Sequence, residues 1–230
     1  MAVSAYPAAL AAERLDFLAL LTPDLREELL AGSVPSHVPA GSLLYQPGQE
    51  PMDYLVTEGL VRAFFASTDG REVTLGFAHA AELAGLIPMP GRPLELYLQT
   101  VTPTSTLRIS DSRLMQLASQ NPLVGLAVAR NTAQMLRKAF HRLAVASLGN
   151  VQERLSCDLL ERACHRQLTA GRLDVRVSHA ELAASIGTSR EAVTRAMTAL
   201  RSQGFVTTVR ERVSLLDPEG LAAVHSGFTV

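Results

Sequence analysis

The chain of 230 residues has only two cysteines, Cys157 and Cys164. This count excludes a disulfide scaffold, and it excludes an iron–sulfur cluster, which takes about four cysteine ligands. On one predicted helix the two are about 10.5 Å apart by helical rise, whereas a disulfide allows at most about 7 Å between Cα atoms. We therefore expect both cysteines to stay reduced and to pack as small apolar residues.

Long apolar runs and an export signal are also missing. The apolar run at 124–129 is far shorter than the roughly 20 residues needed to cross a bilayer. No basic residue precedes Glu13 and Arg14, whereas a secretory signal begins with a basic segment. With few cysteines and no export signal, we expect a cytoplasmic protein without a membrane partner.

Charge is sparse and unevenly distributed. Hydrophobic residues make up 47% of the chain and charged residues 19%, which excludes a disordered protein. The net charge of −1 combines −6 over residues 1–110 with +5 over residues 111–230. An acidic part joined to a basic part indicates a polyanionic partner for the second part, although ordinary scatter is the alternative.

The spacing of apolar residues predicts helices within 8–32 and then a β-structure over 38–110. Thr22 followed by a proline and an acid marks a helix start. Residues 38–110 are short apolar stretches separated by glycines and turn pairs, and 73–77 and 94–98 alternate. Period-two patterning with frequent turns predicts an antiparallel β-roll.

A helical period begins after Asp111 and continues through 123–148 without a proline. Small or apolar residues recur there every seven positions, in two series three residues apart. This pattern predicts the a/d seam of a coiled coil between two copies of the chain. The predicted seam consists of Ala129, Thr132, Leu136, Ala139, Leu143 and Ala146. The alternative is a helix packed on its own sheet through Met135 and Phe140.

A further helix over 151–167 and a strand over 173–177 precede the most informative segment, residues 178–205. A Ser-x-x-Glu capping box at 178–181 begins a helix, and Gly187 permits the left-handed turn that ends it. Thr188 and Ser189 then begin a second helix. Two helices joined by a tight glycine turn predict a helix-turn-helix.

In a helix-turn-helix the second helix enters the major groove, and its first turns meet base edges. The predicted base-reading residues are Arg190, Glu191, Thr194 and Arg195. Arginine donates two parallel hydrogen bonds to guanine, glutamate accepts one from cytosine, and the threonine methyl contacts thymine. A hairpin over 205–215 forms a wing, in which we expect Arg210 and Arg212 to contact phosphates. The alternative is a solvated helix end with an incidental Arg–Glu pair.

These parts together resemble the CRP/FNR superfamily of bacterial transcription regulators over residues 20–217. The resemblance is sharpest at 187–195, Gly-Thr-Ser-Arg-Glu-Ala-Val-Thr-Arg. It implies a homodimer on palindromic double-stranded DNA, with RNA polymerase as a further partner. In the branch typified by the cyclic-AMP receptor protein, an Arg, Glu and second Arg read a TGTGA-type half-site. The residues that inherit these roles are Arg190, Glu191 and Arg195 for bases, and His179, Thr188 and Ser189 for phosphates.

The effector signatures of that family do not match as well. Cyclic-nucleotide binders carry a Gly-Glu pair for the ribose and an Arg-Ser/Thr pair for the phosphate. The corresponding pairs here are Ala84-Gly85 and Leu94-Glu95, and a glutamate at the phosphate position repels an anion. The adenine-contacting hydroxyls fall on Ala139 and Phe140. We therefore expect the cassette to be absent and cyclic-AMP binding not to be tight; a nucleotide-responsive regulator with a degenerate cassette is the alternative.

The sequence thus predicts an α+β protein in three parts: a β-roll sensor domain at 1–118, a dimerisation helix at 119–149 and a winged helix-turn-helix at 150–230. We expect no enzyme, no catalytic residue, no metal and no cofactor. His37, His79 and His141 show no ligand spacing. The rival interpretation, a cupin-type metal enzyme, has only His79 in its β-region. An apolar stretch around 83–98 is either filled core or a site for an apolar effector.

Overall fold

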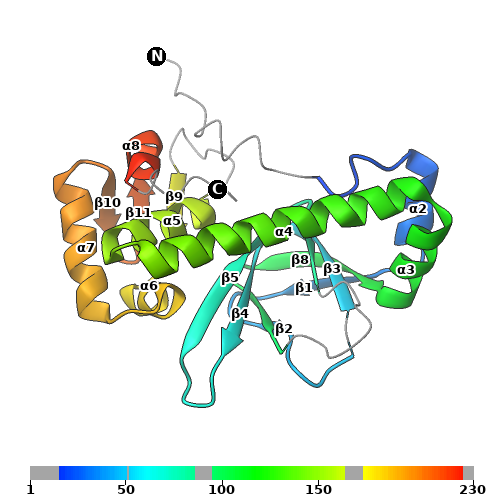
Figure 1. Cartoon of the computed structure of the whole chain (residues 1–230), viewed down its shortest axis with the longest axis horizontal. Coiled ribbons are helices and arrows are strands. Elements are labelled where there is room, and N and C mark those ends of the chain that lie inside the picture. The colour runs from blue at the N-terminus through cyan, green and yellow to red at the C-terminus, as the bar shows by residue number, and fades with distance from the viewer. Residues whose placement is uncertain (1–15, 51, 86–94, 164–172, 225–230) are drawn as a thin grey trace. The chain divides into compact units, whose positions relative to one another are not determined.

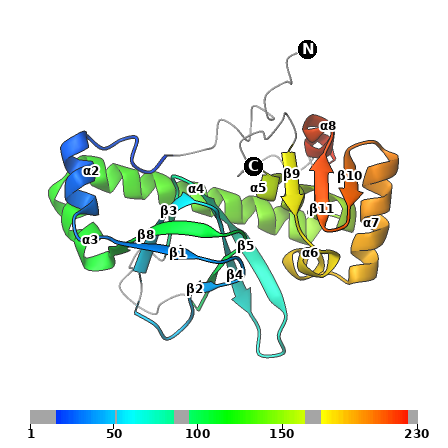
Figure 2. The same ribbon diagram turned by 180° about the vertical axis from the view of Figure 1, so that it is seen from behind.

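A computed structural model of the chain describes residues 16–50, 52–85, 95–163 and 173–224 (Figures 1 and 2). The chain forms two compact units. The N-terminal unit comprises Arg14–Phe65 and Leu75–Arg137, and the C-terminal unit includes Ala66–Thr74 and Lys138–Val230. The long helix α4, Pro122–Leu148, contributes its first part to one unit and its last part to the other.

The predicted β-roll is present as two antiparallel four-stranded sheets, with strand orders β1-β8-β3-β6 and β2-β7-β4-β5. The strands are β1 Val34–Val38, β2 Leu43–Tyr45, β3 Met52–Glu58, β4 Leu60–Ala66, β5 Glu72–His79, β6 Leu83–Ala84, β7 Tyr97–Thr100 and β8 Thr104–Ser110. The first strand begins four residues before the predicted boundary at Val38, because Val34 pairs with Arg108 of β8. Because β8 lies far along the chain from β1, the residues around Val34 carry no sequence signal of this pairing.

Alternation places apolar side chains in the core along part of the strands: in the predicted pattern at 73–77, Phe77 is buried but Val73 is 59% exposed. Leu96 and Leu98 are buried, as the alternation at 94–98 predicts, although Leu94 lies outside the described residues. They pack with Tyr45, Tyr54, Val56, Val61 and Ala84 in one core cluster. Leu83 belongs to a second cluster, so the described part of the apolar stretch 83–98 is filled core.

Two short helices complete this unit and lie together at one end of the sheets (Figures 1 and 2). They are α2 Pro23–Leu30 and α3 Asp111–Gln120. The Thr22 hydroxyl accepts a hydrogen bond from the backbone of Leu25 and caps α2, as the sequence predicts. Of the predicted helical segment 8–32, residues 1–15 lie outside the described part of the chain.

Helix α4 has a buried face and an exposed apolar face. Val124, Ala127 and Val145 are buried, whereas Leu136 is 51% and Leu143 61% exposed. Met135 is 37% and Phe140 51% exposed, so the packing of α4 on the core of the N-terminal unit is carried by Val124 and Ala127 rather than by these two residues. Of the other predicted seam residues, Ala139 is half-buried, and Ala129, Thr132 and Ala146 are exposed.

The C-terminal unit is built from helices around a small sheet of order β10-β11-β9. Its other elements are α5 Val151–Ala163, β9 Leu173–Arg176, α6 His179–Ile186, α7 Arg190–Ser202, β10 Val206–Val209, β11 Arg212–Leu215 and α8 Pro218–Ala223. The end of the helix predicted at 151–167 lies outside the described residues. Leu155, Leu159, Leu182, Val193 and Leu200 lie in one core cluster, which joins α5, α6 and α7.

Candidate nucleic-acid interface

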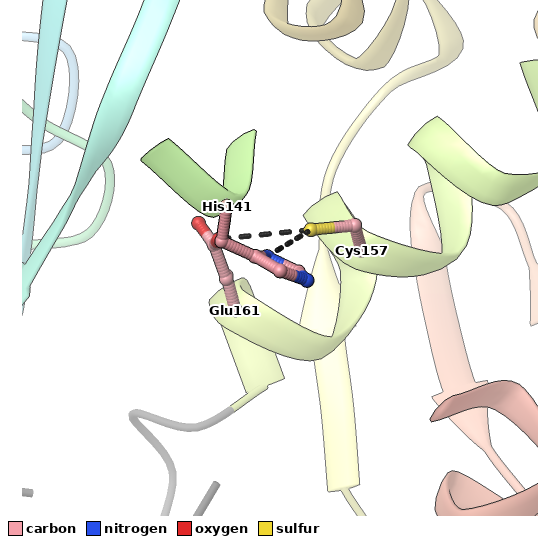
Figure 3. A group of neighbouring side chains, drawn as sticks. All are labelled: His141, Cys157 and Glu161. Atoms are coloured by element: carbon pink, nitrogen blue, oxygen red, sulfur yellow. Dashed lines mark hydrogen bonds between the residues drawn. The ribbon is translucent and has the colours of Figure 1, made fainter. Parts of the chain in front are cut away.

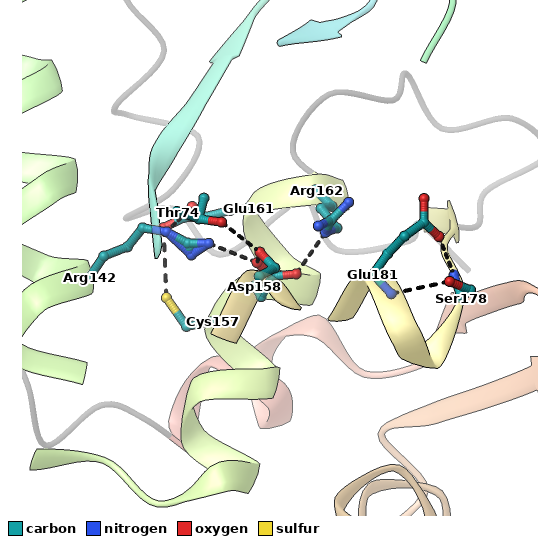
Figure 4. A network of polar contacts seen from close by, with 9 residues as sticks. Thr74, Arg142, Cys157, Asp158, Glu161, Arg162, Ser178 and Glu181 are labelled. Carbon is teal, nitrogen blue, oxygen red and sulfur yellow. Dashed lines mark hydrogen bonds and ion pairs between the residues drawn. The ribbon is translucent and has the colours of Figure 1, made fainter. Parts of the chain in front are cut away.

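Helix α6 begins and ends where its sequence dictates. The Glu181 backbone N–H donates to the Ser178 hydroxyl at 3.2 Å, and the Ser178 N–H donates to the Glu181 carboxylate at 2.7 Å (Figure 4). This is a complete capping box. Gly187 ends the helix with φ of 63°, in the left-handed region that favours glycine. The turn then places the Ser189 hydroxyl where it accepts from the Ala192 N–H and caps α7.

Helix α7 has a buried apolar face and an exposed polar face. Val193, Met197 and Leu200 are at most 2% exposed and pack into the core of the C-terminal unit. The four predicted base-reading residues all lie on the opposite, exposed side: Arg190, Glu191, Thr194 and Arg195. Hydrogen bonds from the Glu191 backbone and from Ser189 lower the pKa of the Glu191 carboxyl, so this side chain is charged at neutral pH.

The helix-turn-helix is also held together by a polar contact between its two helices. The Thr194 hydroxyl donates to the Arg190 carbonyl at 2.9 Å and lies 2.9 Å from Nδ1 of His179. Because the single hydroxyl proton goes to the Arg190 carbonyl, a proton on Nδ1 of His179 fits this contact. Nε2 is then the ring nitrogen left for the predicted contact with a phosphate. Thr194 keeps only its methyl group for a base.

The wing is the β10–β11 hairpin, which lies beside α7 (Figures 1 and 2). Arg210 is at its tip, exposed and with φ of 54°. The Arg212 guanidinium is 64% exposed and pairs with Asp174 of β9 at 3.7 Å. The remaining residues predicted to contact phosphate lie at the turn between the helices, where Thr188 is half-buried and Ser189 exposed.

A buried charge network holds α6 against α5 and α4. Asp158 accepts from the guanidinium groups of Arg142 at 2.7 Å and Arg162 at 2.6 Å (Figure 4). It also accepts from the Ser185 hydroxyl at 2.5 Å. Burial by itself raises the pKa of Asp158, but Arg162, Arg142 and Ser185 together outweigh burial and lower it. The carboxylate therefore stays charged and fixes α6 through Ser185. The sequence did not predict this network: Asp158 and Arg162 are one helical turn apart on α5, but Arg142 and Ser185 come from other helices.

Comparisons with known proteins agree with this geometry. Residues 153–224 match the Crp-like helix-turn-helix domain, and residues 35–121 match the cyclic nucleotide-binding domain. The cyclic AMP receptor protein of Thermus thermophilus is 31% identical over 172 residues, which are 71% of this chain and 74% of that protein. The chain belongs to the CRP/FNR family. Its relatives include transcription regulators, among them the transcriptional regulator SdrP of the same organism, 27% identical over 79% of this chain and 89% of SdrP.

Solved structures of CRP/FNR proteins have the same fold. A putative regulator of this family from Eubacterium rectale superimposes with a TM-score of 0.72 at 19% identity, over 92% of this chain and all of that one. A CRP-family regulator from Thermus thermophilus gives a TM-score of 0.69 at 25% identity, over 83% of this chain and 96% of that one. No helix among the described residues has the length and apolar character of a membrane span.

The match over residues 35–121 corrects one expectation: the prediction that the cyclic-nucleotide cassette is missing is wrong. The acid of the pair was sought at Ala84-Gly85, where Ala84 is buried in β6 and Gly85 packs closely against Asp53. Ala81 has φ of 73°, a conformation that usually requires glycine, and it directly precedes the buried Glu82.

Glu82 is buried and already has partners within the N-terminal unit. Its carboxylate accepts from the His79 backbone N–H at 3.0 Å and from the Gln134 amide at 3.3 Å. The second expected pair, at 94–95, has its first member outside the described residues.

Proposed function

We propose that the chain is a sequence-specific transcription regulator that binds a palindromic, TGTGA-like DNA site as a homodimer. The observation that carries this proposal is the exposed polar face of α7, which presents Arg190, Glu191 and Arg195 opposite a buried apolar face. A helix fixed in this way offers side chains to base edges without a change in its own packing. RNA polymerase remains a predicted partner, and a DNA target is consistent with the cytoplasmic location that the sequence predicts.

The chemistry of the α7 face supports base readout rather than charge attraction alone. The guanidinium groups of Arg190 and Arg195 can each donate two hydrogen bonds to guanine, and the charged carboxylate of Glu191 can accept from cytosine N4. A glutamate repels phosphates, so a surface selected only for non-specific DNA binding gains nothing from it. We assign phosphate contacts to Arg210 and Arg212 of the wing, and to His179, Thr188 and Ser189.

The exposed apolar face of α4 supports the homodimer. Leu136 and Leu143 are more than half exposed, and water contact is unfavourable for side chains of this size at seven-residue spacing. A second copy of α4 would cover them, with Ala129, Ala139 and Ala146 allowing close approach. Two protomers related in this way would present two α7 helices to one palindrome, with half-sites about 34 Å apart.

We further propose that DNA binding does not require cyclic AMP. Glu82, the candidate acid for a ribose, is buried and already accepts hydrogen bonds from His79 and Gln134. A bound nucleotide would have to share or displace these partners. The alternative, a cyclic-nucleotide-responsive regulator, is favoured by the domain match over residues 35–121. Calorimetry with cyclic AMP distinguishes the two, since a micromolar dissociation constant would contradict our proposal.

The test is selection of bound duplexes from a random library with the purified chain, with and without cyclic AMP. We expect enrichment of a two-fold symmetric site with the same half-site in both conditions. The double variant Arg190→Ala/Arg195→Ala is the matched control and should lose enrichment while it stays folded, because both side chains are exposed. Enrichment of asymmetric or unrelated sequences by the wild-type chain would contradict the proposed function.

A further inference from the structure

Three side chains with metal-binding atoms meet where α4 and α5 pack together in the C-terminal unit (Figure 3). Sγ of Cys157 lies 3.8 Å from Nδ1 of His141 and 3.7 Å from Oε1 of Glu161. All three ligand atoms lie within 4.8 Å of one another. Cys157 and Glu161 are one helical turn apart on α5, and His141 comes from α4.

The two distances from Sγ fit a common tetrahedral centre. Metal bonds of about 2.3 Å to sulfur and about 2.1 Å to nitrogen or oxygen place such ligand atoms about 3.6 Å apart at the tetrahedral angle. The two separations from Sγ exceed that value by about 0.2 Å or less. The His141 and Glu161 ligand atoms lie within 4.8 Å of each other and would have to approach to about 3.4 Å, so ion binding requires a movement of these two side chains.

We propose that His141, Cys157 and Glu161 bind a divalent transition-metal ion of the zinc type, with the fourth position left to water. One sulfur, one imidazole nitrogen and one carboxylate oxygen form a borderline-soft set that suits zinc or cobalt. Calcium and magnesium take oxygen ligands, so this set excludes them. The proposal concerns metal binding by the C-terminal unit and does not depend on the proposed DNA target.

The charges around the cluster leave one carboxylate oxygen for the ion. Oε2 of Glu161 faces Arg142, whose Nε lies 3.4 Å away, while Oε1 faces Cys157. The same guanidinium also pairs with Asp158, so its charge is shared between two carboxylates. Binding transfers the Cys157 thiol proton to water as the sulfur–metal bond forms, without any change of oxidation state.

An open pocket with a volume of about 160 Å³ reaches Cys157 and is lined as well by Thr74, Val145 and Arg154. It provides space beside the sulfur through which an ion could approach. The occupied site would join α4 to α5, and α5 contacts α6 through Asp158 and through Arg154, which donates to the Ile186 carbonyl. A bound metal would therefore stabilise the packing of α4 on α5 and, through α5, the position of α6 in the helix-turn-helix.

The experiment is a cobalt titration of the full chain carrying Cys164→Ser, which leaves Cys157 as its one thiol. We expect one cobalt per chain, with a sulfur-to-cobalt charge-transfer absorption band. Further substitution Cys157→Ser should abolish the band, and His141→Gln or Glu161→Gln should weaken binding at least tenfold. His37→Gln, at a histidine outside the cluster, is the matched control and should bind as the parent does.

Absence of the band in the parent, or its persistence after Cys157→Ser, would overturn the proposal. So would equal affinities of the His141→Gln, Glu161→Gln and His37→Gln chains. Thermal melts show whether each variant is folded. Zinc should raise the melting temperature of the parent and of His37→Gln by several degrees, and that of the other variants by less. If Cys157→Ser does not fold, the two glutamine variants still decide the outcome.

Discussion

Arg190 and Arg210 are both exposed arginines of the C-terminal unit, but they occupy different settings. Arg190 is the first residue of α7, whereas Arg210 is at the turn of the wing. We expect Arg190→Ala to cost about 1–3 kcal/mol on a matched duplex and little on a scrambled one, because a lost guanine contact affects only the correct base. Arg210→Ala should weaken binding to both duplexes alike and reduce the salt dependence.

Binding titrations on matched and scrambled duplexes at several salt concentrations measure this difference. Each variant serves as the control for the other, because each removes one positive charge from an exposed position. If Arg190→Ala weakens both duplexes to the same extent, Arg190 does not read a base, and its role is electrostatic.

Asp53 is a second residue with unusual electrostatics, and it lies in the N-terminal unit. Its side chain is fully buried in β3, and neither carboxylate oxygen has a hydrogen-bond donor. Burial, together with the neighbouring carboxyl of Asp111, raises the pKa of Asp53 to about 7. Burial also raises the pKa of Asp111, to about 6. The two acids therefore share protons in the folded protein at pH values where both are ionised in the unfolded chain.

A raised pKa of Asp53 in the folded state makes stability depend on pH. The protonated form contributes its full stability below the ordinary pKa of about 4, and this contribution is lost as the pH rises through about 7. We expect Asp53→Asn, whose neutral amide can donate to Asp111, to unfold with a free energy about 2–4 kcal/mol higher than wild type at pH 8. The difference should shrink at pH 5.

Urea unfolding of both chains from pH 5 to pH 8 tests this prediction. The exposed Glu95→Gln substitution removes one carboxylate without touching the buried pair, and it is the control. A stability difference that does not change with pH would mean that Asp53 is not the titrating group.

Among the elements, α4 has the exposed apolar face that we propose a second copy of the chain covers. We expect Leu143→Glu to raise the dissociation constant of the homodimer about a hundredfold, because covering a charged carboxylate without a partner costs about 3 kcal/mol. The variant should fold, since Leu143 is 61% exposed in the single chain. Arg130→Glu, exposed on the same helix outside the seam, is the matched control and should remain dimeric.

Sedimentation velocity over a range of protein concentrations distinguishes these outcomes. A Leu143→Glu chain that sediments as a dimer at the same concentration as wild type would show that α4 does not form the seam. Loss of dimerisation in both variants would show that charge on α4, and not its apolar face, decides association.

The helices were predictable as elements because each carries its signals locally. The capping box at 178–181, the left-handed glycine at position 187 and the hydroxyl caps Thr22 and Ser189 are all present in the structure. The β-sheets were predictable only as a class. Strand β1 begins at Val34 because of its pairing with β8, and no residue near position 34 signals a partner 74 residues away.

At the scale of the whole molecule, the proposed dimer fixes the spacing of its DNA site. Two α7 helices on one face of the duplex require half-sites about one helical turn apart, which is about 10 base pairs. Insertion of five base pairs at the centre of the selected site turns one half-site to the opposite face of the DNA. We expect the affinity to fall at least tenfold, towards that of a single half-site.

The control duplex replaces five central base pairs and keeps the original spacing. Binding titrations should show it close to the selected site, apart from modest effects of DNA deformability. Tolerance of the insertion would contradict a dimer in which both recognition helices are held at a fixed distance.

The sequence by itself determined the kind of protein, because its strongest signals act within a few residues of one another. Turn glycines, capping residues, strand alternation and the Arg-Glu…Arg pattern at 190–195 each predict their element or chemistry from local spacing. They sufficed for the α+β fold and the exposed face of α7. The match of residues 35–121 to the cyclic nucleotide-binding domain was missed, because Ala84-Gly85 and Leu94-Glu95 do not carry the two residue pairs of the family's cassette.

Only the tertiary structure decided which distant residues meet. Asp158 stays charged in the core because Arg162 on its own helix is joined by Arg142 and Ser185, which come from other helices. His141 and Cys157, which show no ligand spacing in the sequence, come within 3.8 Å because α4 packs against α5. Such contacts depend on helix packing and buried charge balance, and these follow from the folded core as a whole.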